Sequence, residues 1–297
     1  MARLLGIDVG TSGCKLLLLD ETGRIHGSAS REYPLSTPRP GWSEQDPEAW
    51  WAGVSACLAE IGGGWDAIGV TGQMHGSVFL DAVGDVVRPA MLWNDARATE
   101  ECAEIERVVG TERLREITGN PALVGFQLPK LLWLRTNEPA SFRRVRKVLL
   151  PKDYIRYRLG GEFLTDVSDA SGVGALDLAT RDWSDEVLAA VGLSRSLFPR
   201  VIESYAPGGN GDRPLIAGGG GDQAAAAVGT GTVTPGTLSL SLGTSGVVFS
   251  ALPSLAHDPS GAVHTFCHAN GGYHAMGVVL SAGGALRGAP CCVGNSS

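Results

Sequence analysis

The chain has 297 residues, of which 31 are acidic and 24 are basic, and its formal net charge is −7. An acidic chain without a basic block is a poor match to nucleic acid, and no apolar run approaches the roughly 18 residues of a membrane-spanning helix. No leader-type segment precedes the first strand-like run, and the six cysteines show no CxxC or disulfide-type spacing. We therefore expect a cytoplasmic protein with reduced thiols and neither nucleic-acid nor membrane partners.

Glycine is unusually frequent, at 42 of the 297 residues, which is about twice its usual share. The glycines gather in short runs without a collagen period, so they indicate tight turns and places of close backbone approach. Strand-like and helix-like segments are mixed along the chain, and the predicted fold class is α/β.

The first segments in chain order predict a strand meander and then a capped helix. Apolar runs at 4–9 and 14–19 and a third strand candidate at 24–33 are joined by glycine turns, as in antiparallel strands. Asp46 followed by Pro47 predicts the start of the first helix. Helices are expected at 47–61, 98–109, 126–136, 187–191 and 224–228, and further strands at 67–71, 77–80, 86–89, 215–217, 238–242 and 247–249.

One pattern occurs twice: an apolar strand, a Gly-Thr-Ser-Gly turn and a second apolar strand, at 4–19 and at 238–249. The repeat predicts two related domains, which we place at 1–236 and 237–297.

Each Gly-Thr-Ser-Gly turn is a candidate phosphate-binding loop, because successive backbone N–H groups form a nest for phosphate oxygens. A plain hairpin turn is the alternative for each copy. Lys15 follows the first turn and either reaches a phosphate or faces solvent. The candidate nucleotide-binding residues are Gly10, Thr11, Ser12, Gly13, Lys15, Gly243, Thr244 and Ser245.

Two carboxylates stand at chemically informative places. Asp8 ends the first strand and is a candidate Mg²⁺ ligand, with a turn-capping role as the alternative. Asp222 follows four glycines and opens an alanine-rich helix. It is either a helix cap or a base that accepts the proton of a sugar hydroxyl during phosphoryl transfer, with Gln223 beside it for other hydroxyls.

Two polar loops are candidate sugar contacts. The loop 72–76 (Gly-Gln-Met-His-Gly) follows a buried strand, and His75 could donate to a sugar hydroxyl. The segment 93–97 (Trp-Asn-Asp-Ala-Arg) combines an aromatic ring with polar groups, as sugar sites often do. The alternatives are an ordinary loop histidine and a helix start capped by Asp95 or Asn94.

Together these segments resemble the FGGY carbohydrate kinases and, within them, the xylulokinase branch. Their order follows the family from residue 4 to about residue 282. The matching stretches are GIDVGTSG (6–13), GWSEQDP (41–47), GQMHG (72–76), LWND (92–95), LLPKDY (149–154), RDWS (181–184), GGGD (219–222) and SLSLGTSG (239–246).

The resemblance implies an actin-like ATPase fold, in which two ribonuclease-H-like domains flank a cleft. It also implies ATP, Mg²⁺ and a ketose, with D-xylulose converted to D-xylulose 5-phosphate. Met-His at 74–75 argues against glycerol kinases, which carry an Arg-Glu pair there. By position, the catalytic base would be Asp222, the Mg²⁺-organising carboxylate Asp8, and the sugar contacts Met74, His75 and Gln223. Trp93 and Asp95 are further candidate sugar contacts from the composition of their segment.

Family members continue beyond residue 297, and the family-like pattern stops after 280–286. We therefore expect a complete first domain, a partial second domain and a truncation or frameshift near residue 287. A half domain would expose the apolar strands at 238–242 and 247–249, which is a pairing hazard. A kinase for another ketose or pentitol, an inactive sugar-binding remnant and a gene fragment without function remain alternatives, and homodimer formation stays open.

Overall fold

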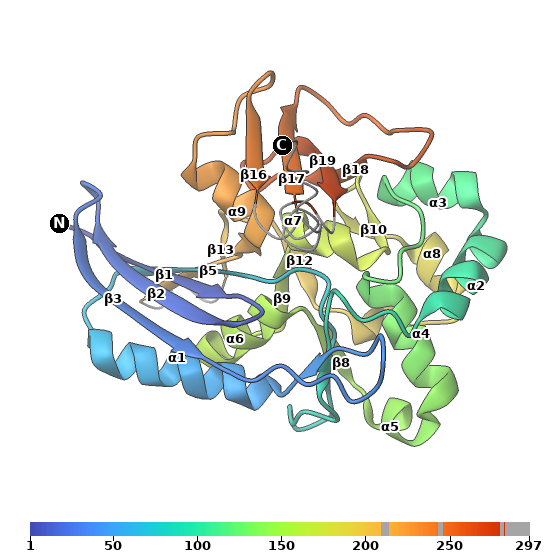
Figure 1. Cartoon of the computed structure of the whole chain (residues 1–297), viewed down its shortest axis with the longest axis horizontal. Coiled ribbons are helices and arrows are strands. Elements are labelled where there is room, and N and C mark those ends of the chain that lie inside the picture. Colours follow the sequence, from blue (N-terminus) through green and yellow to red (C-terminus); the bar gives the residue numbers. More distant parts are fainter. Residues whose placement is uncertain (209–213, 243–245, 280–281, 283–297) are drawn as a thin grey trace, which may run out of the picture.

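The structure is a computed structural model that describes residues 1–208, 214–242, 246–279 and 282. Helices and strands are mixed throughout, as Figure 1 shows, which is the predicted α/β class. The expected phosphate-loop residues Gly243, Thr244 and Ser245 lie outside the described residues.

The described elements alternate between strands and helices. The strands are β1 (Arg3–Val9), β2 (Gly13–Asp20), β3 (Ile25–Glu32), β4 (Glu44–Gln45), β5 (Ala67–Gly72), β6 (Val78–Leu80), β7 (Ala90–Met91), β8 (Lys147–Leu149), β9 (Leu164–Asp166), β10 (Leu176–Asp177), β11 (Asp182–Trp183), β12 (Arg200–Ile202), β13 (Pro207–Gly208), β14 (Leu215–Ala217), β15 (Gly220–Gly221), β16 (Leu238–Leu242), β17 (Gly246–Leu252), β18 (His264–Cys267) and β19 (Tyr273–Val279). The helices are α1 (Pro47–Ile61), α2 (Thr99–Val109), α3 (Thr111–Thr118), α4 (Gln127–Asn137), α5 (Pro139–Arg144), α6 (Pro151–Gly160), α7 (Val167–Ala170), α8 (Asp185–Ala190) and α9 (Asp222–Gly229), with the 3₁₀ turns η1 (Ser171–Val173) and η2 (Arg195–Leu197).

The largest sheet has the strand order β13-β14-β5-β1-β2-β3, and β15 also pairs with β5. The predicted meander is confirmed, since β1 pairs with β2 and β2 with β3 in antiparallel register. β5 joins β1 in parallel. The register sets Asp8 of β1 between Lys15 of β2 and Thr71 of β5, so three polar side chains meet at one end of the sheet.

One face of this sheet is covered by α1 and α6 (Figure 1). The predicted start of α1 is confirmed, because the Asp46 side chain accepts from the backbone N–H of Glu48 and Pro47 is the first helical residue. Trp50 of α1 is fully buried against the sheet. Burial alternates along β1, so the residues between the core positions, Asp8 among them, face the opposite side.

A second core lies among α2, α3, α4 and α8, and a smaller one joins it to the four-stranded sheet β16-β17-β19-β18. Phe126, Phe249 and Phe266 are buried in this smaller core, which therefore holds the last sheet against the rest of the chain.

The expected exposure of apolar strands holds for β16 but not for all of β17. Leu238, Leu240 and Leu242 are 63–73% exposed on the edge strand β16. The prediction was wrong for Phe249, which is 3% exposed, because its side chain points into the smaller core.

Cys14, Cys57, Cys102 and Cys267 are free thiols, and the other two cysteines lie outside the described residues. Over the described ranges, no helix combines the length and the hydropathy that crossing a membrane requires.

Candidate active site

A cavity of about 220 Å³, here called the cleft cavity, lies where the large sheet meets the later four-stranded sheet. It brings together six of the predicted site residues from four separate segments of the sequence, among them Thr11 of the first Gly-Thr-Ser-Gly turn. Its lining consists of Thr11, Gln73, Met74, His75, Trp93, Asp222, Gln223, Val247, Met276 and Val278.

The glycine run before Asp222 lets the backbone pass close to its neighbours. Gly219 has a φ of +91°, and a Cβ there would overlap the carbonyl oxygen of Val70. A Cβ on Gly221 would lie 2.9 Å from the Cγ and Sδ of Met74. Gly221 is the N-cap of α9 and Asp222 is its first residue, so Asp222 is not the helix cap but begins the helix inside the cleft cavity.

The carboxyl group of Asp222 has the electrostatics of a base working near neutral pH. Burial is the main cause that raises its pKa to about 6, and the charge of Asp8 raises it further. Hydrogen bonds from Gln223 oppose that shift. At pH 7 the group is mostly ionised, yet it is a stronger proton acceptor than an ordinary aspartate.

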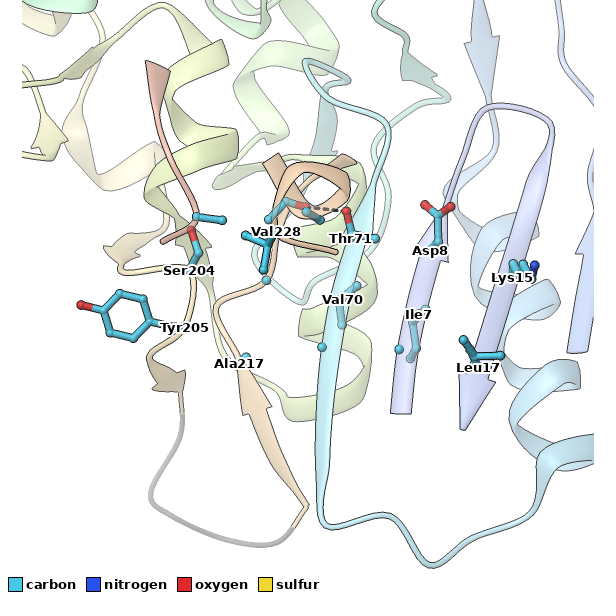
Figure 2. Close-up of a pocket in the computed structure, with 16 residues that line it drawn as sticks. Ile7, Asp8, Lys15, Leu17, Val70, Thr71, Ser204, Tyr205, Ala217 and Val228 are labelled. Carbon is cyan, nitrogen blue, oxygen red and sulfur yellow. Dashed lines mark hydrogen bonds between the residues drawn. The ribbon is translucent and has the colours of Figure 1, made fainter. Parts of the chain in front are cut away.

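Asp8 and Lys15 stand side by side above a second cavity of about 520 Å³, the sheet-face cavity, which Figure 2 shows. Partial desolvation raises the pKa of Asp8, and the nearby Lys15 opposes the shift. Lys15 is exposed and shares a face with Asp8, so its predicted contact with a phosphate stays a prediction.

These surroundings fit a nucleotide-bound Mg²⁺. The described residues contain no cluster of three or more metal-ligating side chains, but such an ion usually takes one or two carboxylates and completes its shell with water and phosphate oxygens. Asp8 is exposed, and its charge reaches Asp222. An oxygen-only donor set of this kind suits Mg²⁺.

The first Gly-Thr-Ser-Gly turn (10–13) is held by its own backbone, by β3 and by Tyr33, which follows β3. The N–H of Gly10 donates to the carbonyl of Gly13 over 3.0 Å, and the hydroxyl of Tyr33 donates to the carbonyl of Gly10 over 2.6 Å. A Cβ on Gly13 would lie 2.5 Å from the carbonyl oxygen of Arg31. Glycine is thus required at Gly13, and the turn is held in one shape.

Gln45 links this turn to the loop 72–76, a role that its motif did not reveal. Its Nε2 donates to the carbonyl of Thr11 over 2.7 Å, and its Oε1 accepts from Gln73 over 3.1 Å. Thr11 in turn donates to Gln73 over 3.2 Å and accepts from the Trp93 indole over 3.1 Å. Gln45 is buried and hydrogen-bonds to both loops, so it fixes the spacing between them.

The structure places Asp95 away from the cleft cavity. Its carboxylate accepts from the Ser43 N–H at 2.7 Å and pairs with Arg97, whose guanidinium lies 3.6 Å from the Trp42 ring centroid. The alternative cap role is also wrong, because Ala98 is the N-cap of α2 and no side chain caps it. Asp95 is committed to holding its own loop, whereas Trp93 lines the cavity.

A buried charge cluster, which the sequence did not suggest, lies beneath the glycine run. The ammonium of Lys152 contacts Asp153, lies 2.8 Å from Asp166 and lies 3.7 Å from Asp169. All four side chains are 0–1% exposed. Burial raises the pKa of Asp153 and Asp169, so carboxylates that outnumber their cation can stay protonated.

This cluster is connected to the backbone that carries Asp222. Asp166 accepts from the hydroxyls of Ser168 at 2.5 Å and Ser204 at 2.6 Å. Ser168 Oγ accepts from the N–H of Gly221 at 3.3 Å, and the carbonyl of Ser204 accepts from the N–H of Gly219 at 3.0 Å. The buried charge cluster therefore positions the glycine run that precedes Asp222, the candidate base.

The cleft cavity has an apolar wall that the sequence reasoning missed. Val247 of β17 and Met276 and Val278 of β19 face it from the later sheet. No local motif marks them, since they reach the cavity only through the pairing of β17 with β19.

Substituting His274 with phenylalanine should make stability less dependent on pH. His274 is 1% exposed, and its ring stacks on Phe249 at a centroid distance of 4.2 Å. Burial lowers its pKa well below the usual value, so as the pH falls below about 6.5 the unfolded chain binds a proton that the folded chain refuses. Below that pH, wild type should lose ~1.4 kcal/mol per pH unit relative to the variant.

Denaturant unfolding of both proteins at pH 8.5, 7.5, 6.5 and 5.5 measures this. The difference between them should be flat at the two higher pH values and should then change in favour of the variant. A constant difference at all four would contradict the burial of a neutral imidazole at His274.

Comparison with known proteins defines the class first. The family model described as "FGGY family of carbohydrate kinases, N-terminal domain" matches residues 3–229. The chain belongs to the FGGY family of carbohydrate kinases, as the resemblance predicted. The actin-like ATPase fold is confirmed with it, because solved structures similar to this chain are carbohydrate kinases of that fold.

Within the family, the chain is similar to xylulose kinases. It is 46% identical to the xylulose kinase of Klebsiella pneumoniae over 298 residues, covering 95% of this chain and 61% of that protein. The xylulose kinase of Escherichia coli is 45% identical, with the same coverage. The crystal structure of a "xyloylose kinase" from Brucella ovis is 45% identical with a TM-score of 0.91, over 96% of this chain and 62% of that one.

The chain thus spans about 61% of the length of the curated relatives that it matches. The family model ends at residue 229, and the domain boundary after residue 236 stays a prediction.

Proposed function

We propose that this chain forms the sugar site of an ATP-dependent ketose kinase that phosphorylates D-xylulose on its terminal hydroxyl. The observation that carries the proposal is the convergence of Met74, His75, Trp93, Asp222 and Gln223 on one cavity next to the first phosphate turn. Similarity to xylulose kinases supports D-xylulose as the sugar.

In the proposed reaction, Asp222 accepts the proton of the sugar hydroxyl as the hydroxyl oxygen attacks the γ-phosphorus of ATP. The phosphoryl group moves to that oxygen and ADP leaves, so the products are D-xylulose 5-phosphate and ADP. The backbone N–H groups of the turn at 10–13 would stabilise negative charge on the phosphates. Mg²⁺, held through Asp8, would neutralise phosphate charge when bound.

The apolar wall has a complementary role. Val247, Met276 and Val278 offer no hydrogen-bonding groups, so they would pack on the C–H face of the sugar while the opposite side of the cavity binds its hydroxyls. An apolar wall also keeps water from competing with the sugar as phosphoryl acceptor.

Sugar binding by the chain itself tests the proposal without requiring turnover. Isothermal titration with D-xylulose should give saturable binding that Trp93→Ala and Gln223→Ala weaken. Ala226→Ser, at an exposed position on the same helix, serves as the control and should bind as wild type does. Absence of binding by wild type would contradict the proposal.

If the chain also turns over, kcat/KM for D-xylulose should fall about tenfold per pH unit below about pH 6, where Asp222 takes up a proton. Asp8→Asn removes a charge that raises the pKa of Asp222, so the same limb should move to lower pH whatever the variant's absolute rate. If the acidic limb of the pH profile did not shift in Asp8→Asn, the group that titrates there would not be Asp222.

A further inference from the structure

His75 is fixed on three sides within the cleft cavity. Its backbone has a positive φ of 65°, which is uncommon for a residue other than glycine. Its ring stacks on Phe126 with the centroids 4.7 Å apart and the planes 19° from parallel. Lys130, which is fully buried, donates from its ammonium to the backbone carbonyl of His75 over 3.0 Å. The ring of His75, a residue that lines the cavity, is therefore held in one orientation.

One ring nitrogen is already committed. Nδ1 of His75 lies 2.8 Å from the carbonyl oxygen of Gly172. A carbonyl oxygen can only accept a hydrogen bond, so Nδ1 must carry the hydrogen. Gly172 lies so close to the ring that a Cβ there would overlap Nδ1 and Cε1 of His75. The close approach thus depends on glycine at this position.

The imidazole is also held neutral. Burial lowers the pKa of His75 to about 3; the hydrogen bond with the Gly172 carbonyl opposes this shift, and the nearby Lys130 and His264 add to it. A neutral imidazole carries one hydrogen in total, and here it is on Nδ1. Nε2, the nitrogen left for a ligand, then presents a lone pair and can only accept.

We propose that His75 is a specificity-determining residue that accepts a hydrogen bond from a hydroxyl of the bound sugar and disfavours any acceptor-only group at that place. This reverses the direction expected from the sequence, in which His75 donates. The proposal rests on the proposed function, and it adds which chemistry the site requires. A ketose would have to turn its carbonyl oxygen away from His75, toward donors elsewhere in the cavity.

The tautomer can be read without any sugar. Nitrogen-15 NMR of the free protein, assigned by comparison with His75→Phe, should show one neutral tautomer with the proton on Nδ1 at pH 7. In Gly172→Ala the ring is displaced and the tautomers should mix. A proton on Nε2 in the wild-type protein would overturn the proposal even if the sugar binds.

Fluorinated sugars test the direction of the bond. Fluorine occupies the place of a hydroxyl but cannot donate, so binding of D-xylulose should be compared with that of its 1-, 3- and 4-deoxy and deoxyfluoro analogues. At one carbon, both analogues should bind about 10-fold more weakly, consistent with loss of one hydrogen bond, and the fluoro compound should be the weaker of the two. If His75 donated instead, the fluoro compound would be the stronger.

The same analogues measured on His75→Phe complete the test. The penalty at that carbon should vanish in the variant, because the accepting nitrogen is gone, while penalties at the other carbons persist. A penalty that remains in His75→Phe would overturn the proposal. Failure of D-xylulose itself to bind to wild type would instead contradict the proposed function, and the NMR result would still decide the tautomer.

Discussion

Asp222→Asn should lower the rate of phosphoryl transfer to D-xylulose by about 10²- to 10⁴-fold, the contribution typical of a positioned base. Asparagine keeps the shape of the side chain but cannot accept the proton of the attacking hydroxyl. Because Asp222 is the first residue of α9 and its backbone is fixed by the glycine run, the exchange should leave the cavity intact. Affinity for the sugar should therefore change much less than the rate.

Gln223→Ala is the matched comparison, since Gln223 is the next residue of the same helix and lines the same cavity. It should weaken sugar binding more than it lowers kcat, the opposite of Asp222→Asn. Rates from ADP release and affinities from titration separate the two effects. If Asp222→Asn retained the wild-type kcat, another group would have to take the proton.

Lys152→Met should destabilise the fold by about 3–5 kcal/mol, the usual cost of removing one partner from a buried ion pair. The substitution keeps most of the side-chain volume but leaves Asp153, Asp166 and Asp169 buried without their cation. Since Asp166 holds the serines that bind the glycine run, the positioning of Asp222 should also suffer.

Arg113→Met is the control for Lys152→Met, because Arg113 pairs with Glu186 where both side chains are half exposed. Such a pair is worth about 1 kcal/mol or less. The loss of folding stability caused by Lys152→Met should become smaller as the pH falls, because the uncompensated carboxyl groups can be protonated in the folded state. Denaturant unfolding at pH 8 and pH 5 measures both points, and a loss equal to that of Arg113→Met would contradict the buried cluster.

Local signals were enough to predict several elements. Asp46 and Pro47 marked the start of α1 because a cap and a fixed φ act within one turn. The β1–β2–β3 meander followed from apolar runs and glycine turns, which are equally local. The family resemblance added the order of the site loops, and the cavity gathers residues from four of them.

Other elements were missed because their buried faces are polar. The helix α6 buries Lys152, Asp153 and Arg156, so the apolar period that marks a helix is absent from its sequence. These residues are stabilised by partners far along the chain, such as Asp166, which no spacing rule reveals.

The site itself shows the same division. Asp95 stands beside Trp93 in sequence, yet only Trp93 lines the cavity, because Arg97 and the N–H of Ser43 engage the carboxylate. Val247 and Met276 enter the cavity through strand pairing that the local pattern could not fix. The Nδ1 of His75 is engaged by the carbonyl of Gly172, which lies 97 residues away in the chain.

The most direct measurement is product formation by this chain, with ADP release followed in a coupled assay and the sugar product identified by phosphorus-31 NMR. With ATP, Mg²⁺ and D-xylulose, wild type should form ADP and D-xylulose 5-phosphate in equal amounts, and Asp222→Ala should form neither at a comparable rate. Equal rates for the two proteins would contradict the proposed role of Asp222 as the base, and a wild-type chain that neither binds nor phosphorylates D-xylulose would contradict the proposed function.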